Sequence, residues 1–155
     1  MYEVVANRRR YTSKQMGDAC EMLIAAELTL AGIPASKAPD LWPDYDIFAQ
    51  PFEGAPLKIS VKSRTLGKAH YVAFDPDRCD WLAVVLLETA ARGKECRHIY
   101  LIPSNIALEE SHELKKPKRK SARCRLTISR VRKILAKYKD NFVLDPNPSP
   151  EAPGN

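Results

Sequence analysis

The sequence lacks any apolar run long enough to span a membrane, and it lacks the cysteine spacing of a zinc site or a disulfide framework. The longest clean apolar run, Trp81 to Leu87, is far shorter than the roughly 20 residues that a membrane helix needs. Cys20, Cys79, Cys96 and Cys124 stand singly, with no Cys-x-x-Cys pair and no nearby histidine pattern. We therefore expect reduced, mostly buried thiols in a cytoplasmic protein without a membrane partner.

An excess of positive charge is present instead, and it is clustered. The net charge of +6 favours an anionic partner. No apolar stretch follows the basic residues Arg8 to Arg10 near the N-terminus, so these residues do not indicate a signal peptide. Any one cluster is as readily a solvated face, but several in one small domain favour contact with phosphates. The clusters are Arg8, Arg9 and Arg10, then Lys115, Lys116, Lys118, Arg119 and Lys120, and then Arg123, Arg125, Arg130, Arg132 and Lys133.

The length of 155 residues fits one domain with a sizeable core. No internal repeat is visible. Residues 145–155 are rich in proline and have little apolar content, which predicts a disordered tail. The expected organisation is therefore a single domain over residues 1–144 followed by this tail.

One long helix is predicted after Thr12 and Ser13, which are both good N-cap residues. Met16, Cys20 and Leu23 recur at helical spacing, and Ile24, Leu28 and Ala31 do so on the adjoining stripe. Gly32 supplies the C-terminal stop. Residues 34–43, with three prolines, are expected to form an irregular connection.

Alternating and apolar segments predict several strands after this helix. Residues 45–50 and 57–64 are expected to form a hairpin about Gly54, which would set Asp46 across from Lys62 on the same face. Strands are also predicted at 71–74, 81–88 and 97–103, with an edge strand at 123–129, and a short helix is expected from Ser104. A last helix over 130–138, capped by Ser129, would bury Val131, Ile134, Leu135 and Tyr138. This order predicts an α/β fold with a mixed central sheet.

Acids and bases come within plausible reach of one another at three places. Glu21 lies on the first helix with the small residues Gly17 and Ala25 four positions to either side. Asp46 opens the first strand of the hairpin, and Ser60 and Lys62 share one face of the second strand. Each of these residues alone is more often an ordinary surface residue than a ligand or catalyst.

Together, "GDACEMLIAAELTLAG", "PDYDI" and "ISVKSR" resemble the PD-(D/E)XK nuclease superfamily, in its small bacterial, resolvase-like branch. The resemblance runs from about Ser13 to Pro103. It implies the restriction-endonuclease-like fold, a three-layer α-β-α arrangement around a mixed sheet. By position, Glu21 would be the helix acid, Asp46 the main metal-binding acid and Lys62 the lysine that orients the attacking water. Asp44 competes with Asp46 for its role.

The activity implied is hydrolysis of DNA phosphodiesters with Mg²⁺ or Mn²⁺. A hard divalent cation polarises the phosphoryl oxygen and lowers the pKa of a bound water. Mg²⁺ takes oxygen ligands and keeps several waters, so Glu21, Asp46 and the Val61 carbonyl would suffice to hold one ion. Arg64 and the basic residues of the first two clusters would grip the DNA backbone. A homodimer is one expected assembly, because a duplex has two strands to cut.

Ser60 departs from this pattern, because the family has Asp or Glu at this position, and Gln in part of this branch. Serine is shorter and neutral, so the site loses one negative charge and metal binding is expected to be weak. Two interpretations stay open. The chain is a working nuclease, or it is a nuclease-fold module that lost the chemistry and now binds nucleic acid or a protein partner.

Overall fold

The computed structural model describes residues 11–40, 45–88, 97–114 and 123–150. Several predicted site residues lie outside these ranges: the nucleic-acid contacts Arg8 to Arg10 and those at 115–120, and the alternative acid Asp44. No helix within the described ranges is long and apolar enough to cross a membrane.

The first helix, α1 (Ser13–Leu30), forms as its sequence predicts. Thr12 caps it: the Thr12 hydroxyl accepts from the Gln15 backbone N–H, and the Gln15 side chain accepts from the Thr12 N–H. Gly32 follows the helix with a φ of +98°, a conformation that glycine adopts without strain. Met16, Cys20, Ile24 and Leu28 are buried on one stripe of the helix, which fixes the face that meets the sheet.

The central sheet has five strands in the order β1-β2-β3-β5-β6. The strand bounds are Ala35–Lys37 for β1, Ile47–Ala49 for β2, Leu57–Thr65 for β3, Trp81–Leu87 for β5 and Arg97–Pro103 for β6. β3 and β5 are parallel and the other neighbouring pairs are antiparallel. The predicted mixed sheet is therefore confirmed.

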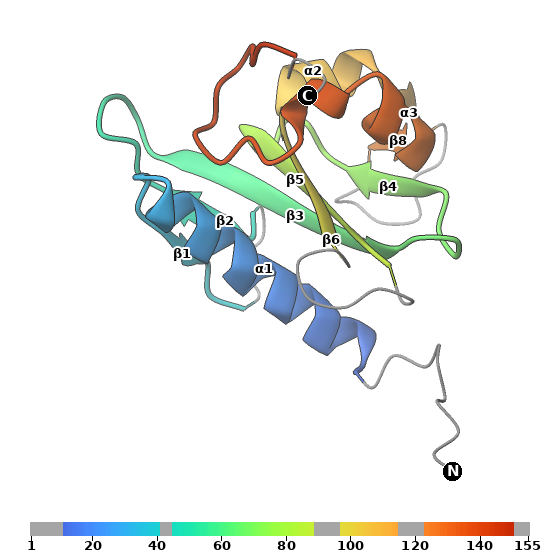
Figure 1. Ribbon diagram of the computed structural model, residues 1–155, viewed down its shortest axis with the longest axis horizontal. Helices are drawn as coiled ribbons and strands as arrows, with labels where there is room; N and C mark the ends of the chain where they lie inside the picture. Colours follow the sequence, from blue (N-terminus) through green and yellow to red (C-terminus); the bar gives the residue numbers. More distant parts are fainter. Residues whose placement is uncertain (1–10, 41–44, 89–96, 115–122, 151–155) are drawn as a thin grey trace, which may run out of the picture.

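A second sheet, called the small sheet below, has three strands in the order β4-β8-β7. The strand bounds are Tyr71–Phe74 for β4, Cys124–Thr127 for β8 and His112–Glu113 for β7. The remaining helices are short: α2 (Ser104–Glu109), α3 (Ile128–Lys133) and the 3₁₀ helix η2 (Ala136–Tyr138). In Figure 1, α1 crosses one side of the central sheet, and β4, β8, α2 and α3 lie on the other. The outer layer on that second side is therefore part sheet and part helix.

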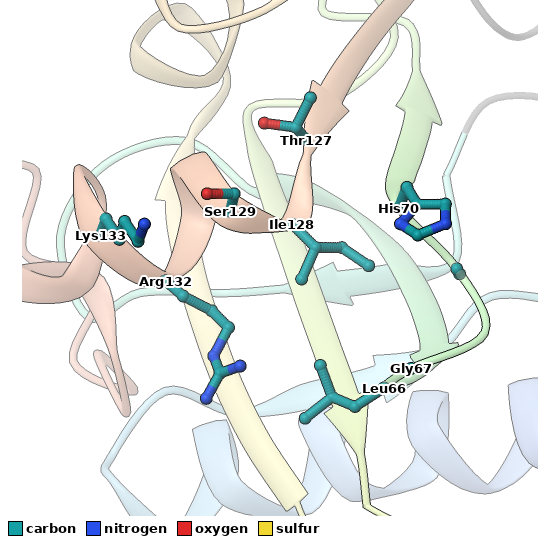
Figure 2. A pocket seen from close by; sticks show the side chains of 9 residues that line it. Leu66, Gly67, His70, Thr127, Ile128, Ser129, Arg132 and Lys133 are labelled. Carbon is teal, nitrogen blue, oxygen red and sulfur yellow. The ribbon is translucent and has the colours of Figure 1, made fainter.

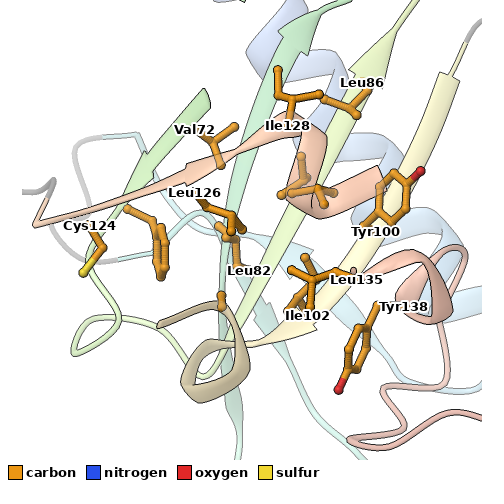
Figure 3. Close-up of a cluster of buried hydrophobic side chains, with 14 residues drawn as sticks. Val72, Leu82, Leu86, Tyr100, Ile102, Cys124, Leu126, Ile128, Leu135 and Tyr138 are labelled. Atoms are coloured by element: carbon orange, nitrogen blue, oxygen red, sulfur yellow. The ribbon is translucent and has the colours of Figure 1, made fainter. Parts of the chain in front are cut away.

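Alternate residues of β5 divide between two buried clusters, one on each face of the central sheet. Leu82, Val84 and Leu86 belong to the cluster that includes Leu126 of β8 and Tyr138 of η2 (Figure 3). Trp81, Ala83 and Val85 belong to the cluster that includes the buried stripe of α1. A strand buried on both faces explains why residues 81–87 read as a nearly continuous apolar run.

Three predictions about local structure are wrong. Residues 34–43 are not wholly irregular, because β1 forms there by pairing with β2. The segment around β8 is not an edge strand, because β8 lies between β4 and β7. The last helix begins earlier than expected: Thr127 rather than Ser129 caps α3, since the Thr127 hydroxyl accepts from the Arg130 N–H.

The last helix also ends earlier than predicted, which changes which side chains are buried. The helix ends after Lys133, so the helical stripe predicted to run on to Tyr138 is interrupted. Val131, Leu135 and Tyr138 are buried as predicted, but Ile134 is 53% exposed.

The first residues of the predicted tail make contacts with the domain. The Tyr138 hydroxyl donates to the Pro146 carbonyl, and the Lys137 ammonium donates to the Asn147 side-chain oxygen. Residues 145–150 contain no helix or strand, and 151–155 lie outside the described ranges.

Candidate active site

Asp46 lies just before β2, at the place where the pairing of β2 with β3 ends. Its backbone N–H donates to the Ile59 carbonyl at 3.0 Å, and Ile59 is also the register partner of Ile47. Two consecutive residues therefore face one residue of β3, which is the arrangement of a β-bulge. A bulge redirects the side chain at its first position, here the Asp46 carboxylate.

The predicted pairing of Asp46 with Lys62 is wrong by about two residues. Because Ile47 pairs with Ile59, the hairpin centre falls at Glu53 rather than at Gly54. The Asp46 carboxylate instead accepts a hydrogen bond from the Val61 backbone N–H, with Oδ2 to N at 2.7 Å. This side chain takes the place of a strand partner at the edge of β3 that β2 leaves uncovered.

The Val61 carbonyl points toward the same uncovered edge. The Ile59 carbonyl accepts from Asp46, so it faces the β2 side. Backbone groups two residues apart on a strand point in the same direction, so the Val61 carbonyl and N–H face that side too. Asp46 and the Val61 carbonyl thus place two kinds of oxygen at one sheet edge.

Glu21 approaches this edge from α1. Its side chain is only 18% exposed. Burial raises the pKa of the Glu21 carboxyl, and the negative charge of Asp46 raises it further. Lys37 opposes both effects. The structure therefore brings together the two acids that the sequence singled out.

Lys37 of β1 is a charged residue of this site that sequence reasoning missed. Its Nζ lies 3.1 Å from an Asp18 oxygen, 3.3 Å from a Glu21 oxygen and 3.3 Å from an Asp40 oxygen. These carboxylates raise the pKa of the Lys37 ammonium, the hydrogen bond to Asp18 most of all. No local sequence signal marks Lys37, because its position depends on the pairing of β1 with β2.

Ser60 and Lys62 lie on the opposite face of β3 from α1. Their register partners in β5 are Leu82 and Val84, which belong to the cluster under the small sheet. By contrast, Thr65 contacts Met16 of α1 with Oγ1 to Sδ at 4.0 Å. The four predicted site residues therefore lie on different sides of β3. Glu21 lies on the α1 side, Ser60 and Lys62 lie on the opposite face, and Asp46 lies at the strand edge.

Cys79 is the buried neighbour of Ser60 and Lys62. Burial raises the pKa of its thiol to about 12, and the charge of Asp80 adds to this. The nearby Lys62 ammonium and a hydrogen bond from the Ser60 backbone act in the other direction. A thiol with such a pKa stays protonated at neutral pH, so Cys79 is a packing residue rather than a nucleophile.

The oxygen atoms at this edge suit a hard cation in kind but are few in number. The Asp46 carboxylate, the Val61 carbonyl and the Glu21 carboxylate are ligands of the type that Mg²⁺ and Mn²⁺ take. Across the described ranges, no group of three or more His, Cys, Asp or Glu side chains is placed to hold a metal ion. Ser60 lies on the other face of β3 and adds no charge, so two carboxylates and one carbonyl fit at most one loosely held ion.

Two other polar residues near the site have structural roles. The Asp80 carboxylate accepts from the Lys58 backbone N–H at 2.8 Å, and the Asp80 N–H donates to the Lys58 carbonyl, which extends the β3–β5 pairing. The Arg64 guanidinium donates to the Ser63 and Tyr71 carbonyls at 2.7 and 3.3 Å. Arg64 thereby ties β4 to β3.

No protein-family model matches the chain, and no curated protein matches it significantly. Among solved structures, the chain is similar to a bacterial homing endonuclease, I-Ssp6803I, at 16% identity and a TM-score of 0.53. That match covers 86% of this chain and 93% of the endonuclease. A match to Hjc, a Holliday junction resolvase of Archaeoglobus fulgidus, has 19% identity and a TM-score of 0.45, and covers 74% of this chain and 85% of the resolvase.

The similarity to the homing endonuclease concerns the fold. At this level of identity it assigns no residue a role. It agrees with the α/β architecture around a mixed sheet that the sequence predicted.

Proposed function

We propose that the protein is a metal-dependent endonuclease that hydrolyses phosphodiester bonds of DNA. The observation that carries this proposal is the position of Asp46. Its carboxylate lies at the edge of β3 beyond the end of β2, accepts a hydrogen bond from the Val61 N–H and raises the pKa of the Glu21 carboxyl, within a fold shared with a homing endonuclease. Carboxylates at such an edge also suit a divalent ion.

Asp46, Glu21 and the Val61 carbonyl would hold one Mg²⁺ or Mn²⁺ ion. When bound, such an ion polarises a phosphoryl oxygen and makes an attacking hydroxide available near neutral pH. The Val61 N–H fixes the orientation of the Asp46 carboxylate. The bulge at Asp46 keeps this carboxylate at the edge, where a substrate has access.

Lys62 would hold the attacking water and stabilise negative charge on the phosphate, which an ammonium does best where water is partly excluded. It is half-buried on the face of β3 opposite α1. Arg8 to Arg10 and the basic residues at 115–120 would contact the DNA backbone, which carries no sequence information in itself.

A second function is favoured by two specific observations. Ser60 removes a carboxylate, and Lys37 already neutralises Glu21 at 3.3 Å. Both features weaken the attraction for a divalent ion. A protein that kept the fold and the basic surface but lost the metal would bind DNA without cutting it.

Nicking of a supercoiled plasmid tests the first function against the second. Wild-type protein in excess with Mn²⁺ is expected to nick the plasmid, and a chelator should abolish the activity. Asp46→Asn is the matched variant, because its side-chain oxygen can still accept from the Val61 N–H. We expect this variant to bind DNA but not to nick it. Nicking that persists in Asp46→Asn would refute the proposed site, and binding without any nicking by wild type would favour the second function.

A further inference from the structure

A cavity of about 790 Å³ opens between the turn that follows β3 and the junction of β8 with α3. Leu66 and Ile128 form an apolar floor, Arg132 and Lys133 supply cationic groups, and His70 supplies an imidazole (Figure 2). Thr127 and Ser129 add two hydroxyls. Among the described residues no carboxylate lines the cavity, so its described lining attracts anions.

The polar side chains of this cavity differ from their neighbour Arg130 in making no ion pair with the described acidic residues. Within the described residues, no ion pair involves His70, Arg132 or Lys133, whereas Arg130 pairs with Glu110 at 2.7 Å. Arg132 interacts with the Tyr100 hydroxyl, which keeps its guanidinium near the cavity. The two uncompensated cations beside one hollow, Arg132 and Lys133, repel each other, and an anion bound between them relieves this repulsion.

The cavity also lies in line with the candidate active site. Lys62, Arg64 and Leu66 follow one another on the same side of the same chain segment, with Leu66 directly after β3. Four residues of strand correspond to about 13 Å. Since a duplex advances about 3.4 Å per nucleotide of each strand, this distance corresponds to roughly four nucleotides. A DNA strand at Lys62 therefore reaches the cavity without bending far.

The small sheet continues this basic surface beyond the cavity. Thr127 pairs with Tyr71 in the β4–β8 register, and the Arg125 guanidinium lies 3.6 Å from the centroid of the Tyr71 ring. Both Tyr71 and Arg125 are exposed. The basic residues at 115–120 belong to the segment that joins β7 to β8 in the chain.

We infer that this cavity is a second DNA contact of the protein, which binds backbone phosphate through Arg132, Lys133 and His70 a few nucleotides from the phosphate at Lys62. This inference rests on the proposed function for its choice of DNA. It is independent of cleavage, because binding at the cavity needs neither Asp46 nor a metal ion.

Salt dependence of DNA binding tests this inference. Fluorescence anisotropy with a labelled DNA duplex, in the presence of a chelator, gives the slope of log K against log salt concentration. Each phosphate contact contributes about 0.9 to this slope. Lys133→Gln should therefore flatten the slope by about 0.9, and Arg132→Gln with Lys133→Gln by about 1.8. Lys139→Gln removes the same charge outside the cavity lining and should leave the slope nearly unchanged.

Lys133 is exposed, and its side chain makes no hydrogen bond or ion pair with the described residues, so Lys133→Gln is expected to keep the fold even if the Arg132 variant disturbs Tyr100. Equal slopes for Lys133→Gln, Lys139→Gln and wild type would overturn the inference. If a polyglutamate peptide of equal charge displaces the duplex, the inferred DNA contact is also overturned, and an acidic protein becomes the favoured ligand of the cavity.

The same measurements separate the cavity from the hydrolytic function. If wild type fails to nick DNA but Lys133→Gln still flattens the slope, the cavity binds DNA and the hydrolytic function is refuted. If the slopes are equal but nicking needs Asp46, the hydrolytic function is supported and the DNA contact at the cavity is refuted.

Discussion

The Lys37 ammonium lies 3.3 Å from the Glu21 carboxylate. A metal ion held by Glu21 and Asp46 would therefore compete with Lys37 for the Glu21 carboxylate. Lys37 also contacts Asp18 and Asp40, so several carboxylates share one cation. An internal cation of this kind keeps the acids compatible in the absence of metal. It also opposes the entry of a second cation.

Removing this internal cation should strengthen metal binding. Lys37→Gln takes away the charge that repels a divalent ion and frees the Glu21 oxygen, so we expect roughly fivefold tighter binding of Mn²⁺ by isothermal titration calorimetry. Lys14→Gln is the matched control, because Lys14 pairs with Asp18 at 2.9 Å and not with Glu21. Equal affinities for Lys37→Gln and wild type would show that Lys37 does not oppose the ion.

The raised pKa of Glu21 predicts how stability depends on pH. A carboxyl whose folded-state pKa lies above its unfolded value stabilises the fold below the unfolded pKa, and this contribution is lost as pH rises through the folded pKa. Glu21→Gln cannot titrate. Relative to this variant, wild type should therefore be more stable in acid than near neutral pH, as measured by urea unfolding at a series of pH values.

Glu27→Gln, on the same helix, controls for the loss of a helix carboxylate in general. A wild type that gains stability over Glu21→Gln as pH rises would contradict the burial and the closeness to Asp46 that raise the Glu21 pKa.

Adjacent residues after α3 should differ sharply in their contribution to stability. Leu135 is buried in the cluster under the small sheet, so Leu135→Ala should lower the free energy of unfolding by about 2–5 kcal/mol. Ile134 is 53% exposed, so Ile134→Ala should change it by less than about 0.5 kcal/mol. Thermal or urea unfolding of the two variants measures this. Similar losses of stability in both variants would contradict the exposure of Ile134 and support the uninterrupted helix that the apolar spacing predicted.

The parts of the fold that the sequence predicts well are those with a strong local signal. The capped stripe of α1 and the apolar run of β5 each specify their element without help from distant residues. β1 and β7 have only three and two residues, so their existence depends on a partner strand rather than on their own sequence. The Thr127 cap was missed because Ser129, two residues on, is an equally good candidate by residue type.

The candidate site divides in the same way. Asp46 raises the pKa of the Glu21 carboxyl, because α1 packs directly on the face that β2 and β3 share, but the roles that the resemblance implies for these two acids remain a proposal. The bulge at Asp46 and the position of Lys37 depend on exact register, which the turn "PFEGAP" does not specify. The predicted register is wrong by two residues, so the Asp46 carboxylate contacts the Val61 N–H rather than lying across from Lys62.

Ser60→Glu should restore the missing carboxylate. Ser60 is half-buried on the face of β3 that carries Lys62, at the strand edge where Asp46 lies. A third carboxylate raises the charge of the donor set, so we expect tighter Mn²⁺ binding and faster DNA cleavage. Ser60→Gln has a similar length without the charge, and it should behave like wild type in metal binding.

The most direct test of the proposed site is a side-by-side cleavage of labelled DNA by wild type, Asp46→Asn and Ser60→Glu, with excess protein and Mn²⁺. We expect slow cutting by wild type, none by Asp46→Asn and faster cutting by Ser60→Glu. Silence from all three proteins, or cutting by Asp46→Asn at the wild-type rate, would contradict the claim that the edge of β3 at Asp46 is a hydrolytic site.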